Sequence, residues 1–198
     1  MRNPRCRSGV RTDGEVVVWS VTRRCNLHCG HCYADSHDRE YPGELSTGEG
    51  ERLLADLASF GVPTVLFSGG EPLLRPDVLE LAARAGELGM RTVLSTNGTR
   101  IDAAKAGELG RAGFSYVGVS LDGLDSTNDK LRGSRGAFEA ALGGIRAARD
   151  AGLPRAARPR GARRALRALR VPRGLWRQSR PRLRDQWRPP RRGSELSV

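Results

Sequence analysis

The sequence predicts an α/β domain built on a parallel sheet, with about four strand–helix units. Between residues 15 and 153, short runs rich in β-branched residues alternate with longer segments whose apolar residues recur at helical spacing. Strict alternation of this kind predicts parallel strands joined by right-handed crossovers. Each strand is followed by a cluster of small or polar residues, and the carboxyl edge of a parallel sheet is where such proteins bind ligands.

The first two predicted strands flank a helix. Residues 16–21 form a continuous apolar run, which is typical of a strand buried on both faces. Leucine recurs at helical spacing over residues 47–59, where Thr47 is the expected N-cap and Gly61 ends the helix. A second β-branched run, residues 63–67, predicts the neighbouring strand.

The rest of the domain repeats this alternation. We expect strands over residues 91–96 and 114–121, and helices over residues 77–88, 102–109 and 137–151. Gly89 and Gly110 are expected to end two of these helices, because glycine readily adopts the left-handed conformation that follows a helix.

Charge divides the chain near residue 153. The 198 residues carry a formal charge of +12, yet residues 154–198 contain 15 Arg, two acids and no Lys. Their net charge is therefore +13, and the preceding residues sum to −1. We expect a disordered N-terminus over residues 1–14, a folded core over residues 15–153, and a disordered, basic, low-complexity tail over residues 154–198.

Composition disfavours several classes of protein. No apolar run approaches the ~18–20 residues that cross a bilayer, so no membrane partner is expected. Residues 1–10 lack the apolar segment of a secretory signal. Three of the four cysteines lie within eight residues, which argues against a disulfide framework and favours a reducing cytoplasm. Because the folded core is not basic, nucleic acid is not an expected partner.

Three cysteines follow the first strand in a C-x3-C-x2-C arrangement. Cys25, Cys29 and Cys32 fit in one short loop, and three soft sulfur ligands without a fourth favour an iron–sulfur cluster with one open iron. A Cys29–Cys32 redox pair is an alternative, which leaves Cys25 without a role. Zinc is another, because a fourth ligand is available among His28, His31, His37 and Cys6.

These motifs resemble those of the radical S-adenosylmethionine (SAM) superfamily. The resemblance rests on the cysteine loop together with Gly69-Gly70-Glu71-Pro72 after the second strand, and it extends over about residues 16–152. The surrounding segments VWSVTRRCNL, HCYADS and LFSGGEPL are similar to the branch that modifies sirohaem-derived tetrapyrroles in haem d1 and alternative haem biosynthesis. Peptide-modifying maturases share many of these residues and are the alternative. The implied fold is a partial (β/α) barrel, of which about four units are present.

The resemblance implies that Cys25, Cys29 and Cys32 ligate a [4Fe–4S] cluster whose fourth iron binds SAM. Reductive cleavage of SAM would give a 5′-deoxyadenosyl radical, with reduced ferredoxin or flavodoxin as the electron donor and a tetrapyrrole as the small-molecule substrate. The resemblance also implies SAM contacts from residues at the strand ends and beside the last cysteine, namely His31, Gly69, Gly70, Glu71, Pro72, Ser95, Thr96, Asn97, Ser120 and Asp122.

Several of these residues also have a purely structural interpretation. Two successive glycines are typical of a tight turn, Thr-Asn-Gly is a turn formula, and Asp122 is equally suited to capping a turn. Trp19 and Tyr33 are interpreted as core residues rather than cofactor contacts. Arg132 and Arg135 resemble a recurring basic site of the tetrapyrrole branch, although a solvated charge is the simpler interpretation.

The tail departs from the family pattern. Family members usually continue with two further strand–helix units, whereas residues 154–198 are dominated by Arg, Pro, Ala, Gly and Leu. These residues have GC-rich codons, so we interpret the tail as the product of a frameshift. A functional basic arm, with Trp176 and Trp187 stacking on RNA, is the alternative. If the tail is a frameshift product, a further functional alternative is an inactive remnant that at most binds the cluster.

Overall fold

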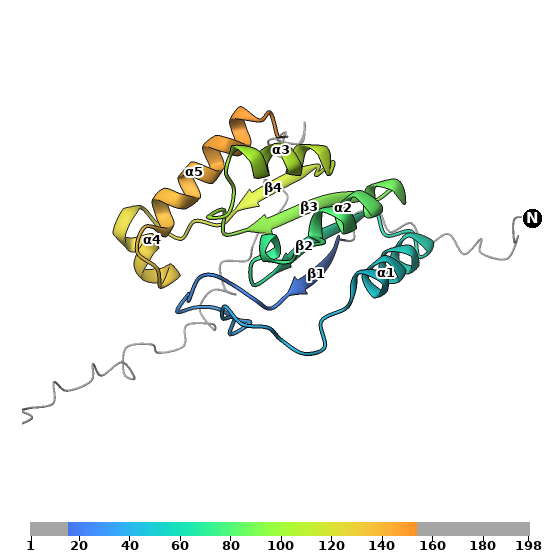
Figure 1. The fold of residues 1–198 in the computed structure, drawn as a ribbon, viewed down its shortest axis with the longest axis horizontal. Coiled ribbons are helices and arrows are strands. Elements are labelled where there is room, and N and C mark those ends of the chain that lie inside the picture. The colour runs from blue at the N-terminus through green and yellow to red at the C-terminus, as the bar shows by residue number, and fades with distance from the viewer. Residues whose placement is uncertain (1–15, 154–198) are drawn as a thin grey trace, which may run out of the picture. The chain divides into compact units, whose positions relative to one another are not determined.

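A computed structural model describes residues 16–153, and the expectations for the N-terminus, Cys6 and the basic tail lie outside this range. One parallel sheet in the order β1-β2-β3-β4 contains β1 (Val16–Thr22), β2 (Thr64–Gly69), β3 (Arg91–Thr96) and β4 (Tyr116–Val119). Because the spatial order follows the sequence, each strand lies beside its predecessor (Figure 1). The predicted α/β class with about four strand–helix units is confirmed.

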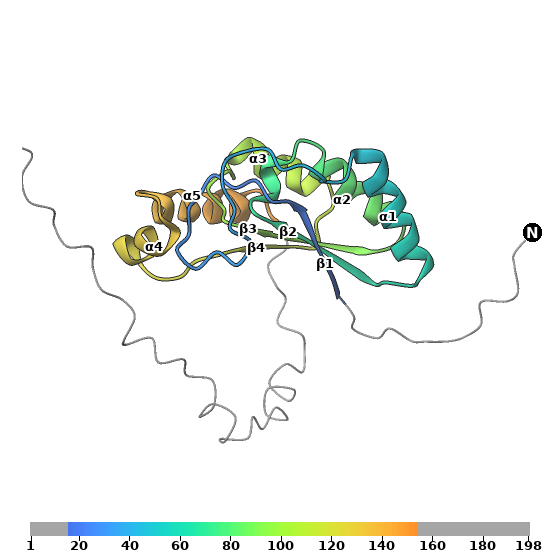
Figure 2. The same ribbon diagram turned by 90° about the horizontal axis from the view of Figure 1, so that it is seen from below.

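Three helices, α1 (Thr47–Ser59), α2 (Val78–Glu87) and α3 (Ala103–Arg111), connect successive strands and cover one face of the sheet. Two more helices, α4 (Asp125–Arg132) and α5 (Ala137–Asp150), follow β4, and a short 3-10 helix η1 (Pro72–Leu74) follows β2. Figure 2 shows α1, α2 and α3 on the same side of the sheet, and α5 packs beside α3. Between residues 16 and 153, no helix is long and apolar enough to cross a membrane.

The hydrophobic core lies between the sheet and this helical layer. Alternate strand residues, including Val65, Phe67 and Leu94, are completely buried there. The Phe67 ring centroid lies 5.8 Å from that of Trp19 and 6.0 Å from that of Phe114. Trp19 therefore packs against the core, as predicted.

The prediction that the first strand is buried on both faces is wrong. Trp19 and Val21 face the core, whereas Val16 and Val18 are 52% and 60% exposed. β1 lies at an edge of the sheet, and the helices α1 to α3 lie against the opposite face from Val16 and Val18. A continuous apolar run therefore does not by itself distinguish a half-covered strand from a fully covered one.

Element boundaries differ from the predictions where side-chain capping or glycine geometry decides them. Ser46, not Thr47, caps α1, because its hydroxyl accepts the N–H of Glu49 while the Glu49 carboxylate accepts the N–H of Ser46. α3 continues through Gly110, and Gly113 with φ 77° is the left-handed residue that follows its end. β4 spans only residues 116–119 of the predicted 114–121.

The helix α4 was not predicted. Its sequence, DSTNDKLR, has no apolar periodicity, and Asn128 is its single buried residue. An isolated segment this short and polar is a poor helix, and tertiary contacts stabilise it here. The cysteine loop supplies two of those contacts.

Candidate active site

The cysteine loop leaves the carboxyl end of β1 and lines a cavity of about 510 Å³. Cys25 is 6% exposed, Cys29 and Cys32 are half-buried, and all three thiols are free. The remaining wall comes mainly from the ends of the other strands, at residues 68–70, 95–97 and 119–122. The predicted convergence of the strand-end clusters on one edge of the sheet is therefore confirmed.

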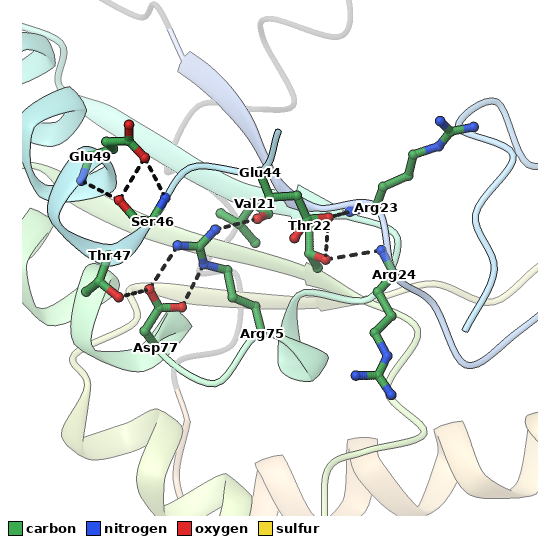
Figure 3. A network of polar contacts seen from close by, with 10 residues as sticks. All are labelled: Val21, Thr22, Arg23, Arg24, Glu44, Ser46, Thr47, Glu49, Arg75 and Asp77. Carbon is green, nitrogen blue, oxygen red and sulfur yellow. Dashed lines mark hydrogen bonds and ion pairs between the residues drawn. The ribbon is translucent and has the colours of Figure 1, made fainter. Parts of the chain in front are cut away.

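A network of polar contacts fixes the chain just before Cys25 (Figure 3). The Glu44 carboxylate accepts the Thr22 hydroxyl at 2.9 Å and the Arg23 N–H at 2.7 Å. The Arg24 N–H in turn donates to the Thr22 hydroxyl at 3.1 Å. The chain direction is thus set before the first cysteine is reached.

A buried ion pair contacts the carboxyl end of β1. The Arg75 guanidinium donates to the Val21 carbonyl at 2.9 Å and pairs with Asp77 at 2.7 Å. The Thr47 hydroxyl also donates to Asp77, at 2.8 Å, which ties α1 to this pair (Figure 3). The side chains of Arg75 and Asp77 are only 7% and 13% exposed, so each charge compensates the burial of the other.

Gly69 and Gly70 are required because two chain segments approach closely. A Cβ on Gly70 would lie 2.3 Å from the carbonyl oxygen of Arg24, and one on Gly69 would lie 2.1 Å from that of Thr22. This approach allows two backbone hydrogen bonds of 2.8 Å, from Gly70 to Thr22 and from Glu71 to Arg24. The glycines thus hold the end of β2 against the cysteine loop. Both also line the cavity, so their contact with SAM stays a prediction.

Glu71 and Pro72 are buried behind the cavity and do not line it. The Glu71 carboxylate accepts the Thr96 hydroxyl at 2.7 Å, the Asn97 N–H at 2.7 Å and the Leu73 N–H at 3.1 Å. Burial raises the pKa of this carboxyl, and the three donors partly oppose the shift. The structure therefore places Glu71 as a link between the ends of β2 and β3 rather than in the wall that a ligand would touch.

The last turn of α4 holds another side of the cysteine loop. The His28 N–H donates to the Arg132 carbonyl at 3.2 Å, and the Gly30 N–H donates to the Leu131 carbonyl at 3.1 Å. Gly133 ends the helix with φ 65°, and a Cβ there would lie 2.0 Å from the His28 carbonyl oxygen. Carbonyls that a helix leaves unpaired at its end are thus satisfied by the cysteine loop.

The polar side chains of Asp122, His31 and Arg132 lie together in the cavity wall. One carboxylate oxygen of Asp122 lies 3.2 Å from His31 Nε2 and 2.8 Å from Arg132 Nε. Arg132 also directs Nη1 toward the Cys29 sulfur, at 3.9 Å. Its side chain is 12% exposed, so the interpretation as a solvated charge is wrong for Arg132, whereas Arg135 is exposed as that interpretation expects.

The thiols differ in acidity because their surroundings differ. Burial raises the pKa of Cys25 and outweighs the hydrogen bonds from the Leu27 N–H and the Asn97 amide. At Cys32 burial also acts to raise the pKa, but hydrogen bonds from the backbone N–H groups of residues 34–36 and from the Ser36 hydroxyl outweigh it, and the pKa is lowered. Hydrogen bonds of this kind stabilise the thiolate, which is the form that binds iron.

Most of the predicted site residues line this one cavity. They are Cys25, Cys29, His31, Cys32, Gly69, Gly70, Ser95, Thr96, Asn97, Ser120 and Asp122. Tyr33 lines it too and is 83% exposed, so the core interpretation is wrong for this residue.

Other cavity residues had no signal in the sequence. Leu27 lies between the first two cysteines, and Ser36 follows the last one. Only their positions relative to the motif could have suggested a role for them. The Ser36 hydroxyl is buried and contributes to the lowered pKa of the Cys32 thiol. Asn128 is 1% exposed and accepts the N–H of Asp122 at 3.0 Å, which fixes that part of the wall.

The donor set fits an iron–sulfur cluster. Three free thiols surround one cavity, and N–H donors from Leu27, Asn97 and Arg132 point at two of the sulfurs. Within the described residues, no three His, Cys, Asp or Glu side chains are placed to share a single metal ion. A [4Fe–4S] cluster binds each thiolate at a different iron, so its ligands need not converge on one point.

Known proteins share the sequence and fold of this region. The chain is 60% identical over 138 residues to the Fe-coproporphyrin III synthase of Methanosarcina barkeri, covering 70% of this chain and 35% of that protein. It is 48% identical over 142 residues to the pre-heme d1 synthase of Dinoroseobacter shibae, covering 72% and 35%. The chain thus spans about a third of the length of these curated relatives.

A solved structure and a family model agree with these relatives. Streptococcus suis SuiB bound to S-adenosylmethionine superposes with a TM-score of 0.58 at 26% identity, covering 70% of this chain and 32% of SuiB. The sequence model of the radical SAM superfamily matches residues 19–158, which include the cysteine loop and every strand end that lines the cavity. The chain therefore belongs to the radical SAM superfamily.

Proposed function

We propose that this chain binds a [4Fe–4S] cluster through Cys25, Cys29 and Cys32 and binds SAM in the adjoining cavity. The observation that carries the proposal is the placement of these three free thiols around the same cavity as the ends of β2, β3 and β4. When bound, the cluster supplies the electron that cleaves SAM reductively to a 5′-deoxyadenosyl radical. Membership of the radical SAM superfamily supports this chemistry.

The chain's own residues supply complementary groups for SAM. The backbone at Gly69 and Gly70 is uncovered by side chains and offers carbonyl oxygens to an ammonium group. The Arg132 guanidinium offers a positive charge for a carboxylate, and the Ser95 and Ser120 hydroxyls suit ribose or carboxylate oxygens. Apolar side chains, such as Leu27, exclude water from the same space.

A tetrapyrrole is the proposed substrate class of the whole enzyme. Identities of 60% and 48% to an Fe-coproporphyrin III synthase and a pre-heme d1 synthase support this choice. These relatives are about three times as long as the region they share with this chain. Reduced ferredoxin or flavodoxin is the proposed electron donor, and a reducing cytoplasm keeps the three thiols available.

Anaerobic reconstitution with iron and sulfide tests the proposal. The wild-type chain should become brown, bind iron and sulfide in equal amounts, and show a reduced-cluster signal by electron paramagnetic resonance (EPR) that changes when SAM is added. With dithionite it should release 5′-deoxyadenosine. Cys25→Ala, Cys29→Ala and Cys32→Ala should each lose these properties, and the matched control Cys6→Ala, which lies outside the motif, should keep them.

Each contrary result bears on a different part of the proposal. A colourless chain, or one that holds zinc, would refute the cluster. A cluster without deoxyadenosine release would refute SAM cleavage and indicate a remnant that only binds the cluster. Consumption of a precursor peptide instead of a sirohaem-derived tetrapyrrole would refute the substrate class and favour a peptide maturase.

A further inference from the structure

A closed ring of side-chain hydrogen bonds joins the end of β3 to the cysteine loop. The Asn97 amide donates to the Asn26 oxygen at 3.0 Å, and the Asn26 amide donates to the Thr99 hydroxyl at 2.9 Å. The Thr99 hydroxyl donates to the Asn97 oxygen at 2.8 Å and closes the ring. The Thr99 N–H donates to the same oxygen at 2.9 Å.

The ring determines which way the Asn97 amide faces. Two donors from Thr99 meet one end of the amide, so that end must be the oxygen. The amide nitrogen therefore faces Asn26 and the Cys25 sulfur, which lies 4.0 Å away. The Leu27 N–H approaches the same sulfur at 3.5 Å. Cys25 and Asn97 are only 6% and 7% exposed, so little water competes for these contacts.

The Asn97 side chain has no capacity left for another ligand. Its oxygen accepts two hydrogen bonds and its nitrogen directs one hydrogen to Asn26 and the other to Cys25, which uses every donor and acceptor of an amide. Its backbone N–H is bound by the Glu71 carboxylate. A direct contact between this side chain and SAM would require breaking the ring.

We propose that Asn97 is a positioning residue that orients Cys25 and stabilises the reduced cluster, instead of binding SAM through its side chain. The inference rests on the proposed role of Cys25 as a cluster ligand. Reduction adds an electron to the cluster, and an N–H donor directed at a ligating sulfur stabilises the added negative charge and raises the reduction potential. Asn26 and Thr99 hold the donor in place, and Glu71 fixes the backbone behind it.

The potential of the SAM-free cluster separates this role from SAM binding. We would reconstitute the full chain anaerobically without SAM and titrate it electrochemically, following the reduced cluster by EPR. Asn97→Asp keeps an oxygen for Thr99 but replaces the N–H donor with a charged oxygen near Cys25. Thr99→Val removes the hydroxyl that orients the amide, and Thr92→Val is the matched control, because the Thr92 hydroxyl donates to the Gly113 carbonyl, at the other end of β3.

We expect Asn97→Asp to lower the equilibrium constant for reduction about tenfold, a shift of about 59 mV to more negative potential for one electron. Thr99→Val should shift the potential in the same direction by less, and Thr92→Val should leave it unchanged. Circular dichroism and iron content would establish that each variant folds and loads. If Asn97→Asp does not fold, the comparison of Thr99→Val with Thr92→Val decides the question.

The possible failures are distinguishable. If wild type loads a cluster and Asn97→Asp and Thr99→Val load equally well at unchanged potential, the inference is overturned and the proposed function stands. An unchanged potential together with a weakened affinity for SAM would identify Asn97 as a SAM ligand and also overturn it. If the wild-type chain takes up no cluster, the proposed function fails first and the inference fails with it.

Discussion

Replacing Gly70 by alanine tests whether β2 holds the cysteine loop by close backbone approach. The new Cβ would lie 2.3 Å and 2.6 Å from the carbonyl oxygens of Arg24 and Arg23, and backbone atoms cannot rotate away as a flexible side chain can. The loop must therefore move, which weakens the hydrogen bonds from Gly70 to Thr22 and from Glu71 to Arg24. Overpacking costs about 1–3 kcal/mol and a backbone hydrogen bond about 1 kcal/mol. We expect the free energy of unfolding to fall by about 2–4 kcal/mol.

Gly143→Ala is the matched control for this substitution. Gly143 lies within α5, where a Cβ would meet no atom within 4 Å, so alanine should stabilise the helix by about 0.5–1 kcal/mol. Urea unfolding followed by circular dichroism measures both variants, and iron content after anaerobic reconstitution reports on the loop. A Gly70→Ala chain that unfolds at the wild-type urea concentration and loads iron normally would refute the reasoning.

Further substitutions test the core, the buried ion pair and the helix cap. Phe67→Ala should lower the free energy of unfolding by about 3–5 kcal/mol, because the ring is completely buried. Its control is Phe60→Ala, at a residue 80% exposed, which should change the free energy of unfolding by less than about 0.5 kcal/mol in the same urea assay. Asp77→Ala leaves the Arg75 guanidinium buried without its partner and should cost about 3–5 kcal/mol. Burial acts to raise the pKa of Asp77, but hydrogen bonding to Arg75 outweighs burial and holds this pKa below the ordinary value of 3.8. The stability that the pair contributes is therefore present above pH 3.8 and is lost as the pH falls through the lower pKa of the folded state. Asp77→Asn should flatten this acid limb of the stability profile, and an unchanged limb would show that other carboxyls cause it. Ser46→Ala removes the capping box of α1 and should cost about 1 kcal/mol in thermal unfolding, and no change would mean that water replaces the cap.

The sequence located the site through features that are local along the chain. The spacing of Cys25, Cys29 and Cys32 and the order of the strands need no knowledge of distant contacts, and the structure brings them to one cavity as expected. Arg132 could not be placed in this way, because α4 has no apolar periodicity and is held by the cysteine loop. The hydrogen-bond partners of the Glu71 side chain could not be predicted from the local sequence either, because they depend on how β2 and β3 are aligned.

The amino-acid sequence alone determined the alternation of strands and helices, the superfamily and the grouping of three cysteines in one loop, because these follow from periodicity and from short, specific motifs. Only the tertiary structure decided that Glu71 and Asn97 face protein groups, that Tyr33 is exposed, and that Arg132 reaches Cys29. The reason is physical. These hydrogen bonds join residues between 25 and 103 positions apart in the chain, and no local pattern encodes the distances between such residues.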